Sequence, residues 1–347
     1  MKPLSEAAVR HLREVADWPD LSGTHYEILE RVARGGMGTV YRAYDHRLER
    51  DVALKVMSPE SADADAIARI QREARVIARL EHPGIVPVHD LGTLPDGRIY
   101  YTMKLVRGLS LEEHLRDPPS RDELLRIFSR ICEAVAFAHA HDVVHRDLKP
   151  SNVMVGPFGE VLVMDWGVAK LVRKPVGTGR DDGPGGSAPV GKDDVEAARR
   201  VPVGDAGGTE PGRVLGTPGY MAPEQAAGLA GLVDERADIY ALGVILSFML
   251  DGEVLLRASR PARRRKLPRP LAGIIRKATA RVAADRYASV EELAADIDRF
   301  RAGLPVTAYR EGLLDRAERV FNRYRTPIFL VLAYLLMRTL LLLFAQR

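Results

Sequence analysis

Apolar and polar residues alternate along residues 26–57, and this spacing predicts three short β-strands around a cluster of glycines. Apolar residues three and four positions apart then predict a helix over about 63–80. Two more strands, near 86–92 and 98–106, flank the turn sequence Pro95-Asp96-Gly97. This part of the chain is therefore predicted to fold as a small, mainly β lobe.

The pattern becomes helical after the last of these strands. Apolar residues between 124 and 138 mark a long helix with one buried face, and later helices are predicted over 235–251, 270–281 and 289–302. Residues 172–213 are rich in glycine, proline and aspartate without an apolar period, so a disordered insertion is expected there. A larger helical lobe, ending near residue 304, is therefore expected.

The composition is that of an ordinary globular protein, because 46% of the 347 residues are hydrophobic and 28% are charged. The net charge of +4 is mildly basic, and we expect no nucleic-acid partner. The single cysteine, Cys132, falls within the apolar pattern of the long predicted helix and cannot form an internal disulfide, which indicates a core residue in a reducing compartment. The first residues contain no apolar signal-peptide core.

The stretch from Ile328 to Ala345 contains 18 residues, of which Arg338 is the only charged one. Such a run is just long enough to cross the hydrocarbon core of a bilayer, so a transmembrane helix is predicted over 327–345. A helix buried against the domain or against a second copy of the chain is the alternative.

Basic residues just before this run, Arg319, Arg323 and Arg325, favour a cytoplasmic position for the globular part. Residues 304–326 would then form the juxtamembrane linker. Because the sequence stops at Arg347, no sensor domain is expected on the far side of the membrane.

A glycine-rich sequence lies between the first two predicted strands. Glycines let a backbone fold closely over phosphate groups because they carry no Cβ, so a phosphate-binding loop is one interpretation. A plain glycine-rich hairpin is the alternative, since Ala33 stands where a G-x-G-x-x-G loop has its first glycine. The residues of this loop that would contact a nucleotide are Ala33, Arg34, Gly35, Gly36, Met37, Gly38 and Val40.

Lys55 ends an otherwise apolar predicted strand, where a buried ammonium needs a partner. Glu73 on the following predicted helix is the natural partner, and an ion pair would direct Lys55 towards the α- and β-phosphates of a nucleotide. For either residue taken alone, a solvated surface side chain is the alternative.

The most specific sequence is His145-Arg146-Asp147-Leu148-Lys149-Pro150-Ser151-Asn152, which matches H-R-D-L-x-x-x-N at every defined position. In such a loop Asp147 can accept the proton of a substrate hydroxyl, Lys149 can stabilise the transferring charge, and Asn152 can bind Mg²⁺. The loop therefore predicts phosphoryl transfer.

A second candidate ligand for Mg²⁺ is Asp165, which follows an apolar strand within Asp165-Trp166-Gly167. Trp166 replaces the phenylalanine of the D-F-G motif. It keeps a large aromatic ring, but its indole N–H needs a hydrogen-bond partner.

The sequence from Gly216 to Glu224 ends in the Ala-Pro-Glu motif that anchors an activation segment. Because buried charges need partners, Glu224 is expected to pair with Arg286, and Asp238 to brace the backbone of the catalytic loop. Both roles would be structural.

Taken in order, these motifs resemble the eukaryotic-like (Hanks-type) serine/threonine protein kinases of bacteria over about residues 24–303. The resemblance implies an α+β, bilobal fold, with a β-rich N-lobe over about 24–106 and a helical C-lobe over about 107–303, after an N-terminal extension of residues 1–23. It also implies that ATP and Mg²⁺ bind between the lobes and that protein serine and threonine hydroxyls are the acceptors. The positions matched to the adenine pocket are Ala53, the gatekeeper Met103, the hinge residues Lys104 and Val106, and Met154.

Lys149 and Thr217 resemble the serine/threonine branch rather than the tyrosine kinases. One departure is an arginine-rich link over 251–269 that is shorter than the corresponding part of the family, which leaves docking on that face open. Because related kinases often carry one membrane helix, we expect a single-pass protein of the cell membrane in membrane-associated signalling, with a homodimer for autophosphorylation. A pseudokinase scaffold and a small-molecule phosphotransferase are the rival interpretations.

Arg146 would leave an unpaired cation beside the active site unless an anion reached it. A phosphate on Thr209 in the activation segment is the expected anion, since it could order that segment. Thr217 is expected to contact Asp147 and Lys149 as a structural hydroxyl, and a constitutively open segment is the alternative.

Overall fold

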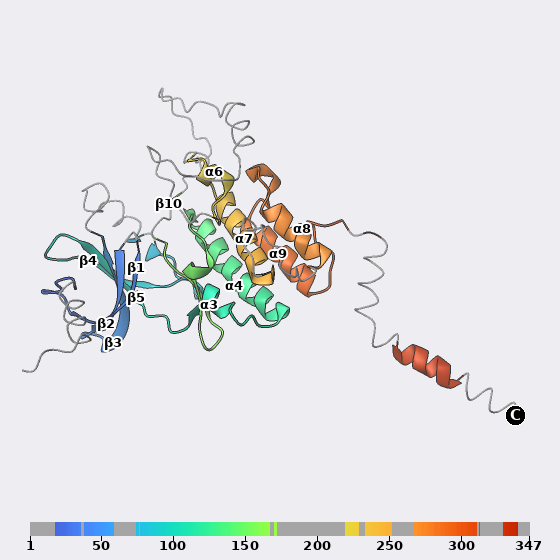
Figure 1. Ribbon diagram of the computed structural model, residues 1–347, viewed down its shortest axis with the longest axis horizontal. Helices are drawn as coiled ribbons and strands as arrows, with labels where there is room; N and C mark the ends of the chain where they lie inside the picture. Colours follow the sequence, from blue (N-terminus) through green and yellow to red (C-terminus); the bar gives the residue numbers. More distant parts are fainter. Residues whose placement is uncertain are drawn as a thin grey trace, which may run out of the picture.

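The computed structural model describes residues 18–35, 38–58, 74–75, 77–166, 170–171, 219–228, 233–251, 267–310, 312 and 329–338. Figure 1 shows a β-sheet at one end of the domain and a group of helices at the other. The predicted α+β, two-lobed arrangement is thus confirmed.

A five-stranded antiparallel sheet forms the N-lobe, in the order β1-β2-β3-β5-β4. Gly38 begins β2 at a φ of 151°, and a Cβ there would lie 2.3 Å from the Val56 carbonyl oxygen on β3. Only glycine allows this close approach of the two strands. The strands are β1 (Tyr26–Gly35), β2 (Gly38–Asp45), β3 (Arg50–Met57), β4 (Val88–Thr93) and β5 (Ile99–Lys104).

The long helix of the C-lobe begins where its sequence provides a cap. Ser120 accepts a hydrogen bond from the Glu123 backbone N–H at 3.3 Å, and the acidic residues Asp122 and Glu123 lie in the first turn. The buried face includes Phe128 and Ile131, and Cys132 is fully buried among them as predicted. The four main helices are α4 (Arg121–Ala140), α7 (Arg236–Asp251), α8 (Arg269–Ala278) and α9 (Val290–Arg301).

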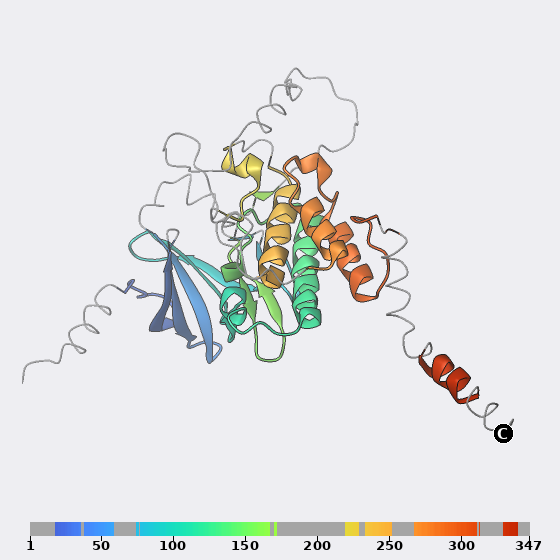
Figure 2. The same cartoon turned by 45° about the vertical axis from the view of Figure 1, so that its right-hand side comes forward.

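The helices of the C-lobe pack around α4, which contacts both α7 and α9 (Figure 2). Several further elements are short, and apart from β9, the strand predicted before Asp165, no periodicity in the sequence predicts them, because each is too short to show one. They are β6 (Leu109–Ser110), α3 (Leu111–His114), β7 (Val143–Val144), η2 (Pro150–Asn152), β8 (Val153–Val155), β9 (Val161–Val163) and β10 (Lys170–Leu171), with α6 (Pro223–Ala226) and η3 (Ala283–Asp285) further along the chain.

The packed chain continues past the boundary predicted near residue 304. Val306 is buried, and the buried carboxylate of Asp296 on α9 accepts hydrogen bonds from the Thr307 backbone at 2.8 Å and its hydroxyl at 2.7 Å. The Ala308 N–H adds a third bond at 3.0 Å. These bonds fasten the segment after α9 to the C-lobe.

The described part of the predicted membrane span, residues 329–338, is helical, and its large apolar side chains are exposed. Within the described ranges, no helix is both long and apolar enough to cross a membrane. The remainder of the predicted span, the whole of the predicted insertion over 172–213, and most of the predicted helix over 63–80 lie outside the described residues.

Candidate active site

Lys55 lies on β3, and its buried ammonium donates a hydrogen bond to the carboxylate of Asp165. Burial lowers the pKa of Lys55, but Tyr101 and Asp165 raise it, and the net shift is upward. Burial raises the pKa of Asp165, and Lys55 outweighs that effect, so this pKa falls below its ordinary value. A charged pair therefore joins the N-lobe to the C-lobe.

The predicted partner of Lys55, Glu73, lies outside the described residues, so that ion pair stays a prediction. Tyr101 is a neighbour that no sequence motif marks. It pairs with Lys55 in the register of β3 and β5, and the ammonium lies 5.8 Å from the centre of its ring. The alternation of side chains along β3 and β5 could have suggested Tyr101 as a neighbour of Lys55 only if the register of the two strands had been known.

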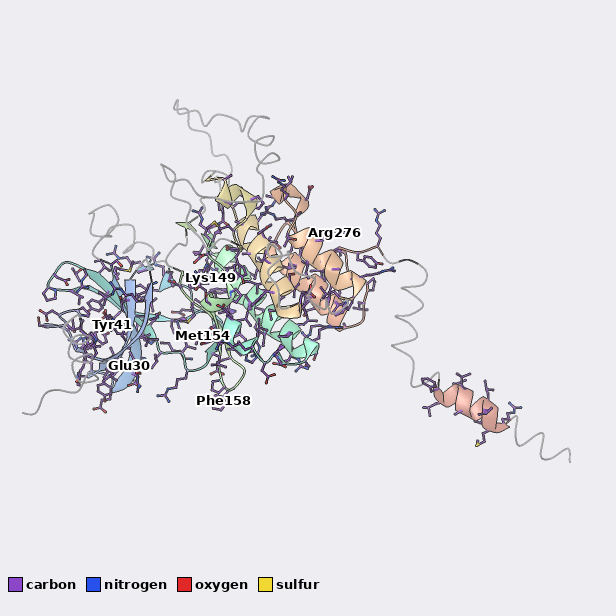
Figure 3. The ribbon with its side chains drawn as sticks, in the orientation of Figure 1. Glu30, Tyr41, Lys149, Met154, Phe158 and Arg276 are labelled. Atoms are coloured by element: carbon purple, nitrogen blue, oxygen red, sulfur yellow. The ribbon has the colours of Figure 1, made fainter. Side chains whose placement is uncertain are left out.

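The predicted catalytic loop brings its three polar side chains together. The Lys149 ammonium donates to the Asp147 carboxylate at 2.8 Å. The Asn152 side-chain amide donates to the Asp147 backbone carbonyl at 2.8 Å and reaches its carboxylate at 3.4 Å. Figure 3 shows Lys149 in the region where the two lobes meet.

Asn152 is also linked to the Asp165 region through the backbone, since the Met164 N–H donates to the Asn152 carbonyl at 2.7 Å. The two predicted metal ligands are therefore held by neighbouring strands, because Asn152 directly precedes β8 and Asp165 follows β9, with which β8 pairs. Asp165 adopts a φ of 55°, a left-handed conformation that is uncommon for residues other than glycine.

Asp238 braces the backbone of this loop, as predicted. One carboxylate oxygen accepts from the His145 N–H and the other from the Arg146 N–H, both at 2.8 Å. The ring of His139 on α4 adds a third bond at 2.8 Å. Burial raises the pKa of Asp238, but the bonds from His139 and the loop outweigh it and hold that pKa below its ordinary value.

Trp166 is buried, and its indole N–H donates to the Val163 carbonyl at 3.2 Å, which supplies the predicted partner. Its ring lies 4.6 Å from that of His145. His145 Nδ1 accepts from the Asp147 N–H at 3.3 Å, so Nε2 carries the proton and donates to the Met164 carbonyl at 2.9 Å. The aromatic residue thus packs beneath the loop that holds Asp147.

The predicted pair of Glu224 and Arg286 is confirmed. Both side chains are buried, and the guanidinium donates to the two carboxylate oxygens at 2.7 and 2.8 Å. It also donates to the carbonyl oxygens of Ala280 and Arg236, each at 2.8 Å. The pair anchors α6 to the C-lobe.

Most of the nucleotide-binding residues predicted from the glycine loop and hinge lie on strands β1, β2, β3, β5 and β8. Val106 follows β5, and Gly36 and Met37 lie outside the described residues. An apolar cluster joins the two lobes, and its members include Val40, Ala53, Met103, Val106 and Leu162. Met154 pairs with Leu162 of this cluster across β8 and β9 and lies between the lobes (Figure 3). Lys104 is exposed, and its backbone N–H donates to the Pro87 carbonyl at 3.1 Å.

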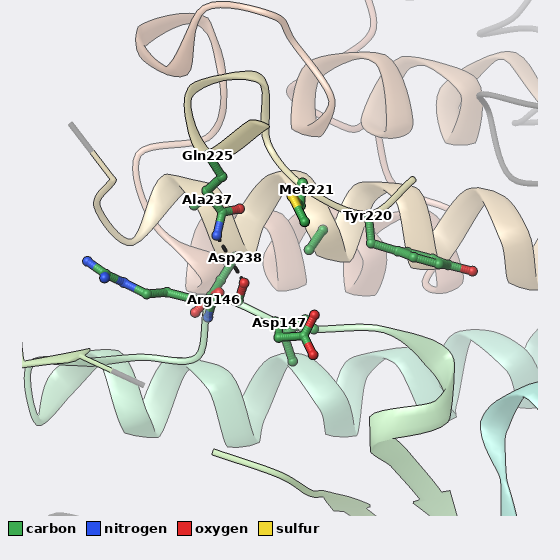
Figure 4. Close-up of a pocket in the computed structure, with 9 residues that line it drawn as sticks. Arg146, Asp147, Tyr220, Met221, Gln225, Ala237 and Asp238 are labelled. Atoms are coloured by element: carbon green, nitrogen blue, oxygen red, sulfur yellow. Dashed lines mark hydrogen bonds between the residues drawn. The ribbon is translucent and has the colours of Figure 1, made fainter. Parts of the chain in front are cut away.

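The prediction that Arg146 lacks a partner unless an anion reaches it is wrong, because its guanidinium donates to the Val233 carbonyl at 3.3 Å. Thr209 and Thr217 lie outside the described residues. A small pocket beside Asp147 is lined by Tyr220, Met221 and Gln225 among others (Figure 4).

His139 and Gln225 both contact the catalytic loop or its brace, and neither is marked by a sequence motif. His139 could have been noticed as a polar residue on the buried face of a long apolar helix. Gln225 offers no such signal, since a glutamine beside an exposed alanine is typical of any helix surface.

A family model for the protein kinase domain matches residues 26–297. The chain is 35% identical over 336 residues to the serine/threonine-protein kinase PknD of Chlamydia trachomatis. The matched region covers 88% of this chain and 34% of PknD. PknD of Chlamydia abortus is 34% identical over 313 residues, covering 81% and 31%. The chain thus spans about a third of the length of these curated relatives.

Among solved structures, the PknI kinase domain of Mycobacterium tuberculosis is similar, with a TM-score of 0.54 and 28% identity over 79% of this chain and 95% of that one. A second structure of that domain has a TM-score of 0.56 at 28% identity, covering 81% and 96%. The family model, the relatives and the solved structures all indicate a protein kinase domain. The chain therefore belongs to the protein kinase family, in its bacterial Hanks-type serine/threonine branch.

Proposed function

We propose that this chain is an active serine/threonine protein kinase, which transfers the γ-phosphoryl group of Mg-ATP to hydroxyl groups of proteins, its own among them. The observation that carries the proposal is the grouping of Asp147, Lys149 and Asn152 by direct hydrogen bonds in one loop. The Lys55 ammonium, paired with Asp165 across the two lobes, supports it.

The predicted metal ligands, Asp165 and Asn152, are suited to bind Mg²⁺. Asp165 and Asn152 supply oxygen atoms of the kind that Mg²⁺ prefers, and the described residues contain no cluster of three or more acidic, His or Cys side chains that could bind a metal alone. Phosphate oxygens of the nucleotide would then complete the coordination, and the metal would neutralise charge on the phosphates. Lys55 would bind the α- and β-phosphates from the N-lobe.

Asp147 is proposed to accept the proton of the acceptor hydroxyl, and Lys149 beside it to stabilise the charge on the transferring group. The Lys149 ammonium lies 2.8 Å from the Asp147 carboxylate, so the proposed base and the proposed charge-stabilising group are adjacent. Neither role requires Asp147 to contribute to the affinity for ATP.

Substitution Asp147→Ala tests the proposal. Full-length protein carrying it should lose transfer of ³²P from labelled ATP to dephosphorylated casein, while its affinity for ATP stays within about threefold of wild type. Asp117→Ala, at an exposed position in the same lobe, is the matched control and should transfer normally. Wild-type protein that binds ATP but transfers nothing would indicate a pseudokinase scaffold instead. Phosphoamino-acid analysis of the product should detect serine or threonine.

We further propose that the kinase domain lies in the cytoplasm and is tethered to the membrane by the apolar segment near the C-terminal end of the sequence. Its described part, residues 329–338, exposes apolar side chains such as Phe329, Leu330 and Leu336, each more than 60% exposed, which water disfavours. Carbonate-washed membranes should retain the full-length protein and lose a version truncated after Arg325. Equal partition of the two versions would refute the tether.

Autophosphorylation between two copies is proposed as the mode of activation, with Thr209 as the acceptor. Labelled ATP and wild-type protein should then phosphorylate an Asp147→Ala copy that cannot phosphorylate itself. Labelling confined to the wild-type copy would show a reaction within one molecule. A phosphate on Thr209 would bind the Arg146 guanidinium beside the Val233 carbonyl, to which one of its five N–H groups donates.

A further inference from the structure

Gln225 connects the end of the activation segment to the catalytic loop. It lies on α6 directly after Glu224, whose carboxylate is held by Arg286. Its side-chain oxygen accepts from the Ala222 N–H at 3.1 Å, and its side-chain nitrogen donates to the Arg146 carbonyl at 2.9 Å (Figure 4). One amide therefore bonds to both its own helix and the loop, 79 positions away in the sequence.

The carbonyl that Gln225 contacts belongs to the peptide bond between Arg146 and Asp147. The N–H of the same peptide donates to His145 Nδ1 at 3.3 Å, so both polar ends of this peptide are bonded. On its other side, the Arg146 N–H is held by Asp238 at 2.8 Å. The planes of the peptides before and after Arg146 are thus both fixed by side chains.

These bonds matter because Arg146 has a φ of 68°, a left-handed conformation that residues with a side chain rarely adopt. Such a conformation persists where neighbouring groups hold it. If the peptide after Arg146 rotated, the backbone of Asp147 would rotate with it, and the carboxylate would leave its position beside Lys149 and Asn152. The direction of the Asp147 carboxylate therefore depends on the hydrogen bond to the Arg146 carbonyl.

We propose that Gln225 is a positioning residue for Asp147, and that it couples the docking of α6 to the orientation of the catalytic base. The proposal rests on the kinase activity proposed above and adds a residue outside the motifs that predict it. When Arg286 holds Glu224, α6 carries the Gln225 amide to the Arg146 carbonyl, and the base is oriented. When α6 undocks, that bond is lost while Lys55, Asp165 and the hinge are unchanged.

The amide group suits this role because it offers an acceptor and a donor at the same time. In Gln225→Glu the acceptor for the Ala222 N–H remains, but a carboxylate faces the Arg146 carbonyl, so the donor alone is lost. In Gln225→Leu both bonds are lost at similar side-chain volume. Ser289→Ala, which removes the N-cap of α9 far along the chain, is the control for a loss of helix stability alone.

The experiment measures single-turnover transfer of ³²P from Mg-ATP to dephosphorylated casein by the full-length protein, together with ATP affinity and melting temperature. Both Gln225 variants should transfer about tenfold more slowly than wild type with ATP affinity within about twofold, because both lose the hydrogen bond to the Arg146 carbonyl that orients Asp147. Ser289→Ala should lower the melting temperature and leave the transfer rate unchanged. If Gln225→Leu does not fold, Gln225→Glu decides. A rate within twofold of wild type for Gln225→Glu, or an equal loss of ATP affinity and rate, overturns the positioning role. Wild-type protein without transfer would refute the proposed function instead.

Discussion

Replacing Glu224 by alanine should destabilise the domain severely, because it leaves the Arg286 guanidinium buried without its carboxylate. The Arg286 side chain has no exposed surface, and it lies 5.0 Å from the ring of Tyr240. Its carbonyl contacts satisfy N–H groups but supply no negative charge. Breaking a buried ion pair by removing one partner costs about 3–5 kcal/mol.

At about 2 °C per kcal/mol for a domain of this size, the melting temperature of Glu224→Ala should fall by about 6–10 °C. Thermal and guanidinium unfolding of the full-length protein in mild detergent measure the change. The matched control is Glu123→Ala, which removes an exposed carboxylate 2.9 Å from Arg126 and should cost less than about 1 kcal/mol. The double variant with Arg286→Ala should lose less than the sum of its two single variants, since no charge then stays unpaired. Equal losses for Glu224→Ala and Glu123→Ala would refute the claim that the pair is buried and essential.

Further changes test other contacts. Asp165→Ala should weaken Mg²⁺-dependent ATP binding, measured by calorimetry with and without Mg²⁺, and unchanged affinity would exclude Asp165 as a ligand. Burial raises the pKa of Asp296, but bonds from Thr307 and its neighbours lower it overall, so its stabilisation is present above the ordinary carboxyl pKa and is lost as pH falls through the lowered one. Asp296→Asn should therefore flatten the acid side of a stability-against-pH curve, and a curve parallel to wild type contradicts this. Trp166→Phe should cost about 1–3 kcal/mol from lost volume and the bond to a backbone carbonyl, while retaining transfer; lost transfer would show that the indole is required. Thr209→Ala should slow peptide phosphorylation if mass spectrometry finds phosphate there, and an unmodified Thr209 would end the switch hypothesis.

Much of the site could be predicted because its residues lie in short, ordered motifs. The eight residues from His145 to Asn152 contain the loop, and their contacts are mostly local, such as Lys149 to Asp147 two positions away. Asp165 is predictable because it begins a variant of the D-F-G motif at the end of an apolar strand. The pairs of Glu224 with Arg286 and of Asp238 with the loop followed from the rule that buried charges need partners.

Other contacts could not be predicted, because they depend on which elements meet in space. Among the described residues, the Lys55 ammonium donates to the carboxylate of Asp165, which lies 110 positions away in the sequence. The Arg146 guanidinium reaches a backbone carbonyl at Val233, and carbonyl groups are present at every residue, so no pattern marks the right one.

The sequence by itself determined the order of the longer strands and helices, the chemistry of the loop and the family, because strand and helix periods and short motifs act over a few residues. The tertiary structure alone decided that Gln225 meets the Arg146 carbonyl, that His139 joins Asp238, and that the segment after α9 is fastened to Asp296. Each of these bonds needs two groups from different segments at hydrogen-bond distance and in matching directions. Distance and direction are set by how the lobes and helices pack, and the linear pattern of apolar and polar residues does not contain them.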